Sequence, residues 1–569
     1  MQVLITVLAI ISAPFKVVRP VISAGNSIRN PAIAIEPEDW GGMKRMNVPM
    51  NVSRFLRRSA LLYGTKPAVL DEDMTLTYRQ FWDRVQRLSH ALRASGIQPG
   101  DRVAWLGYNN HPLLEAYFGV VQFGAILVPL NIRLSPHDLA LILDDAQPRL
   151  LVFDSDFEAV AKELRERRPM ELIEIQIGGR HEGYLSYEEF LASAPDEADA
   201  ADYTLDENTV AEIFYTSGTT GLPKGVALTH RNLYMNALQV LATLDFSDKT
   251  VMLHTIPLFH VNGWGAPHYI TALGATHVML RKFVPTRVLE LIQAHRVTDA
   301  LLVPTMVQAL NLVPNREQYD LSSLKQVTVG GAPSPSSFVA ETSAKLGTDY
   351  HGGYGLSETS PVVSAAVIKD VVSNRPLDDL YRWRGTAGIP LIGIDVSIVD
   401  DSDRELPWDG QTAGELRVRA DSVMQGYWHK PEETRRVIRN GWFYTGDIAV
   451  IDSEGYIKIV DRKKDIIISG GENISSVELE DALYAHPAIR EACVIGKPDP
   501  VWGEVPWAVV SLKDGASNHP DSILDEVNRG LAGFKRLKGI EVIADLPKTG
   551  TGKIQKTVVR QMFGAGWQQ

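Results

Sequence analysis

Residues 215–225 read Tyr-Thr-Ser-Gly-Thr-Thr-Gly-Leu-Pro-Lys-Gly. Four Ser/Thr hydroxyls and three glycines fall within these eleven residues, and Lys224 adds a cation near the end. The apolar residues 210–214 precede the stretch and predict a buried strand. Glycines let a backbone approach a polyphosphate closely, while hydroxyls and N–H groups donate to its oxygens. Because the spacing does not match the Walker loop G-x-x-x-x-G-K-[ST], it predicts a phosphate-binding loop of another kind.

Strands and helices alternate on both sides of this loop. The clearest predicted strands are 103–107 and 150–153, and the clearest predicted amphipathic helices are 78–95 and 286–296. Such alternation is typical of parallel sheets covered by helices. We therefore expect an α/β protein with a large N-terminal domain built from parallel β/α subdomains.

The pattern changes after residue 385. Short strands are predicted at 393–400, 414–420 and 447–460, joined by turns such as 401–403 and 452–455, which indicates a smaller β subdomain. The charged stretch Asp461-Arg462-Lys463-Lys464-Asp465 then interrupts the apolar pattern and predicts a hinge at 461–464. We expect residues 43–460 to form the N-terminal domain and residues 465–569 to form a small, mobile α+β domain.

Composition narrows the class of protein. The chain has 569 residues, a formal net charge of -12 and a single cysteine, Cys493. A chain of this length predicts at least two domains, and its acidic balance argues against a general nucleic-acid binder. Cys493 lies in an apolar run, so we expect a buried core residue and neither a disulfide nor a cysteine metal cluster. These features are typical of a cytoplasmic protein.

The first 42 residues differ from the rest of the chain. Residues 3–11 are strongly apolar, and no acidic residue occurs before Glu36. An apolar run of this length is shorter than the roughly 20 residues that span a bilayer. The segment also lacks the preceding charge and the A-x-A site of a signal peptide. We expect residues 1–42 to be a dispensable leader without stable membrane insertion, and the functional chain to begin near Met43 or Met46.

The loop at 215–225 resembles the phosphate-binding signature of the adenylate-forming superfamily, which includes acyl-CoA synthetases, luciferases and peptide-synthetase adenylation domains. Further signatures of this family follow in the expected order. They are Gly330-Gly331-Ala332-Pro333, Tyr354-Gly355-Leu356-Ser357-Glu358-Thr359, Tyr444-Thr445-Gly446-Asp447, Asp461-Arg462-Lys463-Lys464 and Pro547-Lys548-Thr549-Gly550-Thr551-Gly552-Lys553. Each motif alone is weak, but the ordered set identifies the chain from residue 50 onward as a member.

The resemblance implies an enzyme that uses ATP and Mg²⁺ to activate a small carboxylic acid as an acyl-adenylate, and then passes the acyl group to coenzyme A. Tyr354 offers a flat face for adenine, and Asp447 can accept from the ribose hydroxyls. Glu358 and Thr216 are the expected Mg²⁺ ligands. The expected ATP- and AMP-binding residues are Thr216, Ser217, Gly218, Thr219, Thr220, Gly221, Lys224, Gly331, Ala332, Pro333, Tyr354, Gly355, Ser357, Asp447 and Arg462.

Lys553 is the expected main catalytic residue, together with Glu358 and His260. During adenylation a carboxylate attacks the α-phosphate, so a lysine that contacts both anions would lower their repulsion and stabilise the transition state. By resemblance, the small domain rotates about hinge residues Asp461 and Lys464 between the two half-reactions. The loop formed by Ser469, Gly470, Gly471 and Glu472 would then line the coenzyme A tunnel.

Residues 257–264, Pro-Leu-Phe-His-Val-Asn-Gly-Trp, carry information about the acid. Peptide-synthetase domains place an aspartate near the start of this segment to pair with an amino group, whereas this segment is uncharged apart from His260. The expected acyl pocket, lined by His260, Trp264, Gly331 and Pro333, suits a short- or medium-chain acid without an ammonium group.

The same segment resembles that of fatty acyl-CoA synthetases, plant acyl-activating enzymes and bacterial 3-methylmercaptopropionyl-CoA ligases, so 3-(methylthio)propionate is the narrowest expectation. A medium- or long-chain fatty acid is the alternative substrate. A luciferase-like oxygenase shares every nucleotide motif and is a further alternative. The resemblance also implies a homodimer.

Overall fold

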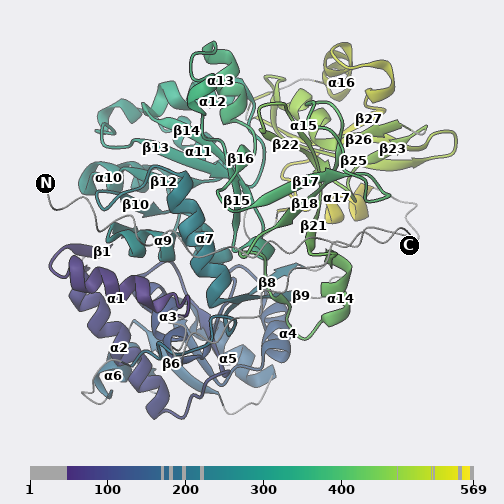
Figure 1. Cartoon of the computed structure of the whole chain (residues 1–569). Helices are drawn as coiled ribbons and strands as arrows, with labels where there is room; N and C mark the ends of the chain where they lie inside the picture. Colours follow the sequence, from purple (N-terminus) through teal and green to yellow (C-terminus); the bar gives the residue numbers. More distant parts are fainter. Residues whose placement is uncertain are drawn as a thin grey trace, which may run out of the picture. The chain divides into compact units, whose positions relative to one another are not determined.

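The structure is a computed structural model of the whole chain (Figure 1). It describes residues 48–72, 74–167, 172–178, 183–194, 200–217, 223–470, 472–513, 515–516, 519–548 and 554–563. The predicted leader, residues 1–42, lies outside these ranges, as do both expected starting methionines.

An eight-stranded sheet carries the predicted phosphate loop. Its strand order is β19-β9-β8-β4-β3-β5-β6-β7, and the strands from β8 to β7 run parallel. The strands are β3 Arg102–Leu106, β4 Ile126–Pro129, β5 Leu150–Asp154, β6 Ile173–Ile177, β7 Leu185–Ser186, β8 Val210–Ser217, β9 Pro223–Thr229 and β19 Gly426–Tyr427. The predicted strands at 103–107, 150–153 and 210–214 are therefore confirmed, with small shifts at their ends.

Helices cover both faces of this sheet (Figure 1). Along β3, Val103 and Trp105 pack with α2 (Tyr78–Ala94) and α3 (His111–Gly119). The alternate residues Ala104 and Leu106 pack with α4 (Pro136–Ala146) and α5 (Glu158–Arg167). Since successive side chains of a strand point to opposite faces, a strand covered on both sides is apolar along its buried length, as β3 is from Val103 to Leu106.

A nine-stranded sheet follows, in the order β16-β15-β14-β13-β12-β10-β11-β1-β2. Its strands from β14 to β1 run parallel, and both edges are antiparallel. The strands are β1 Pro67–Asp71, β2 Met74–Thr77, β10 Val251–His254, β11 Thr276–Met279, β12 Asp299–Leu302, β13 Gln326–Gly330, β14 Asp349–Gly355, β15 Val362–Ala365 and β16 Ile389–Pro390.

Two apolar clusters lie on the two faces of the nine-stranded sheet. One face packs with α10 (Pro285–His295), α11 (Pro304–Asn311) and α12 (Ser336–Leu346). The other face shares a single cluster with the eight-stranded sheet, to which α1 (Ser53–Leu62), α7 (His230–Thr243) and α9 (Ala266–Leu273) contribute. The two sheets are therefore joined through one continuous apolar core.

Local sequence explains where several helices begin. Thr77 and Gln80 form a reciprocal capping box at the start of α2, and Thr229 and Asn232 form another at the start of α7. Asn110 caps α3 by accepting from the backbone N–H of Leu113 at 3.0 Å. Each cap satisfies an amide that the first turn of a helix leaves unpaired, so these helices start directly after a strand or a short loop.

The β subdomain predicted after residue 385 is a five-stranded antiparallel sheet. Its strands are β17 Asp395–Val399, β18 Gly414–Arg419, β20 Ile438–Arg439, β21 Trp442–Ile451 and β22 Ile457–Arg462. The strands and the turn predicted within 447–460 form the hairpin of β21 and β22. Asp461 and Arg462, which were assigned to the hinge, are the last two residues of β22.

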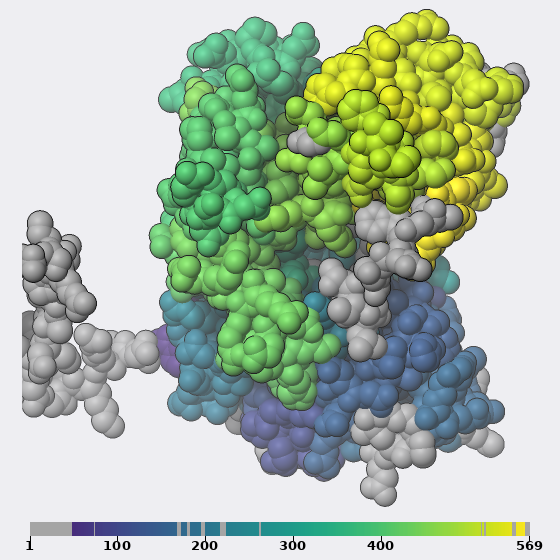
Figure 2. All heavy atoms as spheres, turned by 90° about the vertical axis from the view of Figure 1, so that its right-hand side faces the viewer, coloured from purple at the N-terminus to yellow at the C-terminus, as the bar shows by residue number. Residues whose placement is uncertain are grey.

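The C-terminal part is an α+β unit, whose atoms are drawn in yellow in Figure 2. Its strands are β23 Ile467–Ser469, β24 Glu472–Ile474, β25 Ile489–Asp499, β26 Gly503–Leu512 and β27 Gly539–Val542. Its helices are α15 Ser476–Tyr484, α16 Pro520–Arg529 and α17 Lys556–Phe563. Cys493 is fully buried in an apolar cluster with Ile495 and Val559, as expected. The predicted α/β fold class is confirmed.

None of the helices in the described ranges has the length and apolar character needed to cross a bilayer.

Candidate active site

The hairpin of β8 and β9 presents the predicted phosphate loop. Thr216 lies opposite Lys224 and Ser217 lies opposite Pro223 in the antiparallel ladder, so residues 218–222 form the connection. The predicted loop residues Gly218, Thr219, Thr220 and Gly221 lie outside the described ranges. At the base of the hairpin, the Tyr215 hydroxyl donates to Oδ2 of Asp145 at 2.7 Å. This bond anchors the loop to α4.

Lys224 and Glu358 both contact the side chain of Tyr427. The Lys224 ammonium lies 5.5 Å from the centroid of Tyr427 and pairs with Glu433 of α14 (Pro431–Val437). The Tyr427 hydroxyl donates to Oε1 of Glu358 at 2.9 Å. Burial, with Glu358 nearby, raises the pKa of the Tyr427 hydroxyl, so it stays a donor at neutral pH. The structure thus brings the predicted phosphate cation close to the predicted metal ligand.

Sequence analysis missed Tyr427 and Glu433. Tyr427 belongs to the two-residue strand β19, which pairs with β9 beside the phosphate loop. Neither residue lies in a motif, and about 200 residues separate them from Lys224, so no local pattern marks them.

The turn after β14 presents Ser357 and Glu358 in a short 3-10 helix. Ser357 is buried and Glu358 is half-buried. The Glu358 backbone carbonyl accepts from the N–H of Met424 at 2.8 Å, and this bond fixes the position of the Glu358 backbone. Gly355 is required here, because a Cβ would lie 1.9 Å from the carbonyl oxygen of Pro361. Gly355 therefore allows the backbone at the end of β14 to pass close to the backbone of Pro361.

Two predicted nucleotide-binding residues, Tyr354 and Arg462, contact the buried carboxylate of a third, Asp447. Asp447 is 2% exposed, and its Oδ2 accepts from the Tyr354 hydroxyl at 2.5 Å. Its Oδ1 lies 2.6 Å from Nε of Arg462, which faces Asp447 in the β21–β22 ladder. Burial and the adjacent Asp447 raise the pKa of the Tyr354 hydroxyl well above its usual value. The arrangement leaves the Arg462 side chain half exposed, with its charge directed at Asp447.

The predicted acyl segment follows β10. It turns at 258–260 and continues into the short helix α8 (Val261–Trp264). Trp264 has a positive φ of 61°, an uncommon conformation for a bulky residue. Its indole lies against Gly330, where a Cβ would come within 2.9 Å of Cη2. The half-buried His260 donates its backbone N–H to the Pro257 carbonyl at 3.0 Å.

Gly331, Ala332 and Pro333 continue from the end of β13. Gly331 has a φ of 94°, a conformation that favours glycine, and both Gly331 and Ala332 are exposed. Because the indole of Trp264 lies against the preceding Gly330, the structure brings the predicted pocket residue Trp264 to the start of this turn.

The hinge region is tied to the C-terminal part through Asp461. Its buried Oδ2 accepts from both the backbone N–H and the hydroxyl of Ser476, each at 2.6 Å. The neighbouring Ser475 hydroxyl donates to the Val460 carbonyl at 2.7 Å and caps α15. Lys464 is exposed. Because Lys464 is exposed, its backbone angles can change without breaking apolar contacts, whereas Asp461 nearby stays bonded to Ser476. This arrangement suits a hinge at Lys464.

The predicted coenzyme A loop joins β23 and β24. Ser469 lies opposite Glu472 in this hairpin, and Gly471 lies outside the described ranges. Gly470 has a φ of 58° and donates its N–H to the Trp502 carbonyl at 2.8 Å. A side chain at position 470 would collide with the Trp502 ring, because its Cβ would lie 2.6 Å from Cε3.

The predicted catalytic lysine lies in a loop whose two ends are held together. Lys548 and Ile554 form an isolated β-bridge, and the Gln555 N–H donates to the Pro547 carbonyl at 2.8 Å. The Lys548 ammonium lies 2.5 Å from Oε1 of Glu491. Residues 549–553, Lys553 among them, lie outside the described ranges. The described residues therefore show how the two ends of the loop are closed.

Within the described ranges, no three His, Cys, Asp or Glu side chains gather in a way that could hold a metal ion on their own. Glu358 and Thr216 remain the predicted ligands beside the phosphate loop.

Comparisons with known proteins agree with this geometry. The model of the AMP-binding enzyme family matches residues 56–428, and that of the AMP-binding enzyme C-terminal domain matches residues 478–553. The first range contains the phosphate loop, the acyl segment and Glu358. The second range ends at Lys553.

Several characterised proteins resemble nearly the whole chain. The long-chain-fatty-acid–CoA ligase of Thermus thermophilus is 37% identical over 530 residues, which cover 91% of this chain and 96% of the relative. The 3-methylmercaptopropionyl-CoA ligase of Ruegeria pomeroyi is 36% identical over 491 residues, with coverages of 84% and 90%.

A solved structure shares the arrangement of the chain. The crystal structure of the anthranilate CoA ligase AuaEII in complex with anthranoyl-AMP has a TM-score of 0.82 at 27% identity, and the match covers 91% of this chain and 98% of that one. The chain therefore belongs to the AMP-binding enzyme family and is an AMP-forming acid–CoA ligase, which uses ATP to join a carboxylic acid to coenzyme A.

Proposed function

We propose that this ligase activates a short- or medium-chain carboxylic acid without an amino group, and that 3-(methylthio)propionate is its substrate. The contact between the Trp264 indole and Gly330 carries the proposal. A large ring in van der Waals contact with the turn at the end of β13 leaves little room for a long chain to pass between them.

The charge of the acyl segment supports the same class of acid. Residues 257–264 contain no carboxylate that could pair with an ammonium group. A buried ammonium without a partner is strongly disfavoured, so amino acids should bind poorly. A thioether chain has nearly the shape of a short alkyl chain, and one methylene changes discrimination by only about 1–3 kcal/mol. Butyrate should therefore be a good second substrate.

The nucleotide would be held by two groups of residues. Tyr354, Asp447 and Arg462 would bind adenosine, with Asp447 as the acceptor for the ribose hydroxyls. Thr216, Ser217 and Lys224, together with the hydroxyl of Ser357, would bind the phosphates. Glu358 and Thr216 offer the hard oxygen donors that Mg²⁺ prefers, and the bound ion would offset the charge of the phosphates.

Lys553 and the hinge would organise the two half-reactions. A carboxylate oxygen of the acid bonds to the α-phosphorus of ATP, and pyrophosphate leaves. The Lys553 ammonium would stabilise the charge that develops at phosphorus. The coenzyme A thiol then bonds to the acyl carbon, and AMP leaves. Residues 465–569 would rotate about Asp461 and Lys464 against residues 43–460, so that Ser469–Glu472 admit the thiol.

A medium- or long-chain fatty acid is the second candidate, because the relative from Thermus thermophilus is named a long-chain-fatty-acid–CoA ligase. The two candidates differ in the depth of the acyl pocket, which a series of substrates of increasing length can measure.

The test is thioester formation with ATP, Mg²⁺ and coenzyme A across acetate, propionate, butyrate, hexanoate, octanoate, palmitate, benzoate and 3-(methylthio)propionate. We expect kcat/KM to peak at 3-(methylthio)propionate, with butyrate close behind. A peak at octanoate or palmitate would favour the second candidate and contradict the short pocket. A peak at benzoate would contradict both.

A further inference from the structure

Asn109 binds the backbone at the start of the acyl segment and just before it, through all of its side-chain groups. Its Nδ2 donates to the carbonyl oxygens of His254 and Ile256, each at 2.9 Å. Its Oδ1 accepts from the backbone N–H of Leu258 at 2.7 Å. The amide is 4% exposed, so no water competes for these three bonds.

The two partners come from different sheets. Asn109 lies in the loop after β3 of the eight-stranded sheet, whereas His254 ends β10 of the nine-stranded sheet and residues 255–258 follow it. A second bond crosses at the same place, because the Tyr117 hydroxyl of α3 donates to the Leu258 carbonyl at 2.6 Å. The first part of the acyl segment is thus held at its backbone by a loop and a helix of the other sheet.

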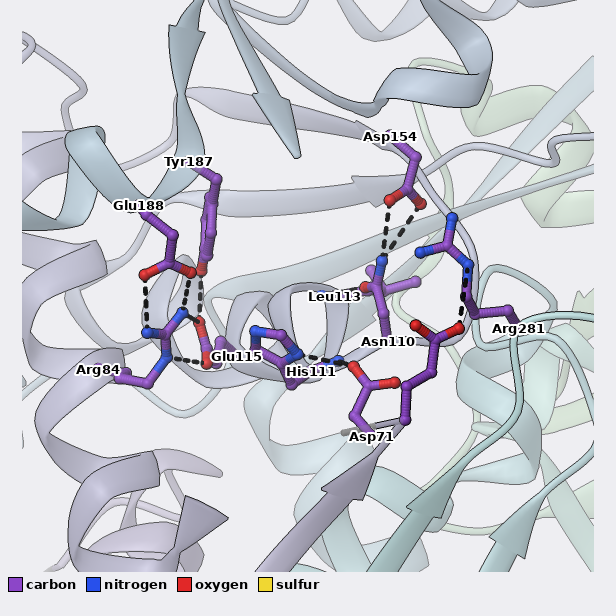
Figure 3. Close-up of polar contacts among 11 residues, drawn as sticks. Asp71, Arg84, Asn110, His111, Leu113, Glu115, Asp154, Tyr187, Glu188 and Arg281 are labelled. Carbon is purple, nitrogen blue, oxygen red and sulfur yellow. Dashed lines mark hydrogen bonds and ion pairs between the residues drawn. The ribbon is translucent and has the colours of Figure 1, made fainter. Parts of the chain in front are cut away.

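Two carboxylates hold the loop that carries Asn109, and Figure 3 shows their contacts with Asn110 and His111. Asp154 accepts from the Tyr108 backbone N–H at 2.7 Å and from the Asn110 amide at 3.1 and 3.2 Å. Asp71 accepts from the backbone N–H of His111 at 2.8 Å and lies 2.7 Å from its Nδ1. Two buried carboxylates therefore hold the residues that flank Asn109.

The bonded backbone supports the pocket residues directly. A Cβ at Gly263 would lie 3.0 Å from Cδ2 of Leu258 and 3.3 Å from the Ile256 carbonyl oxygen, so α8 rests on this part of the segment. Trp264 follows, with its indole against Gly330. A shift of the Ile256–Leu258 backbone would therefore move Trp264 relative to the turn at the end of β13, because packed groups move together.

We propose that Asn109 is a positioning residue that sets acid specificity, by fixing the backbone on which the acyl segment and Trp264 rest. The inference depends on the proposed function, in which residues 257–264 line the acyl pocket. Asn109 itself need not contact the acid. Only an amide of this length suits the position, since a carboxylate would face two carbonyl oxygens without a donor, and an aliphatic side chain would leave three buried backbone groups unpaired.

The test compares Asn109→Ala with Asn232→Ala. Asn232 is a matched control: its Nδ2 donates to the Asp421 and Val423 carbonyls at 2.8 Å and its Oδ1 accepts from the Thr229 N–H at 2.9 Å, away from the acyl segment.

Acid-dependent exchange of pyrophosphate into ATP gives kcat and KM for acids of different length. For Asn109→Ala we expect the kcat/KM ratio between butyrate and octanoate to change by about tenfold, because small displacements of positioned groups are costly. The KM for ATP should stay within about twofold of the wild type, since the three described side-chain bonds of Asn109 all go to residues 254–258. Asn232→Ala should leave the ratio between acids unchanged.

Tyr117→Phe supplies a second variant, which removes only the bond to the Leu258 carbonyl and should shift the same ratio in the same direction by less. It carries the test if Asn109→Ala does not fold. An unchanged ratio in a folded Asn109→Ala, or an equal change in Asn232→Ala, would overturn the inference.

Trp264→Ala separates the two proposals. If it changes the ratio while Asn109→Ala and Tyr117→Phe do not, the pocket assignment stands and the positioning role fails. If none of the three changes it, the pocket assignment fails as well.

Discussion

The Tyr354 hydroxyl donates a hydrogen bond of 2.5 Å to Oδ2 of Asp447, a residue 93 positions away in the chain. The other oxygen of the same carboxylate lies 2.6 Å from Nε of Arg462. The bond joins the nine-stranded sheet to the β subdomain at the place where the two motifs predicted to bind adenosine meet. It also fixes the direction in which Asp447 presents its remaining lone pairs.

Asp447→Asn should weaken ATP binding more than Tyr354→Phe. The amide loses the charge that pairs with Arg462 and one acceptor oxygen, whereas the phenylalanine keeps the ring and loses only the hydroxyl. We expect the KM for ATP to rise roughly tenfold or more in Asp447→Asn, because a hydrogen bond to a charged group contributes about 1.5–3 kcal/mol. Steady-state rates at varied ATP concentration, with saturating acid and coenzyme A, give the KM for ATP. An unchanged KM for ATP would contradict the ribose role.

Lys553→Ala should separate the two half-reactions. Acyl-adenylate formation should fall by roughly 100-fold or more, as for other groups that stabilise charge in a transition state. Thioester formation from supplied acyl-adenylate should persist, because that step needs no charge stabilisation at phosphorus. Lys548→Ala is the matched control in the same loop, since its ammonium pairs with Glu491. Equal loss of both steps in Lys553→Ala would refute its assigned role.

Trp264→Ala should extend the range of acids. Removing the indole opens space beside Gly330, so kcat/KM for octanoate should rise relative to butyrate by roughly tenfold, since each added methylene contributes about 1–3 kcal/mol when it is buried. Trp264→Gly should act in the same direction and also relieve the backbone strain of the positive φ. If neither variant alters the preference between the two acids, the indole does not limit the pocket.

His254→Gln should flatten the dependence of stability on acid pH. Burial lowers the pKa of His254 to about 3, so the folded protein holds it neutral, whereas the unfolded chain takes up a proton below its ordinary value of 6.5. The stability from this group is full above pH 6.5 and is lost as pH falls from 6.5 toward 3. The wild type should therefore lose about 1.4 kcal/mol per pH unit more than the variant in this window.

Urea denaturation at pH 7, 6 and 5, followed by tryptophan fluorescence, gives that difference in slope. Parallel slopes for the two proteins would contradict the neutral, buried state of His254.

Much of the fold could be predicted because its signals are local. The predicted helix at 78–95 is α2 (Tyr78–Ala94), whose start is set by the Thr77 cap and whose apolar face repeats with the helical period. The predicted strand at 150–153 is β5 (Leu150–Asp154), which is apolar up to its last residue because both faces are covered. The strands and the turn predicted within 447–460 are likewise confirmed, since the turn at 452–456 joins β21 to β22.

The site divides in the same way. The sequence by itself was enough to predict which residues carry the chemistry, because the loop at 215–225 and the motifs around Glu358, Asp447 and Lys553 are each complete within a few residues. Only the tertiary structure decided that Tyr427 lies between Lys224 and Glu358, and that Asn109 holds the backbone before Leu258. These contacts depend on strand order and on which helices pack between the two sheets. Residues more than a hundred positions apart are brought together by burial of a shared core, for which no local pattern exists.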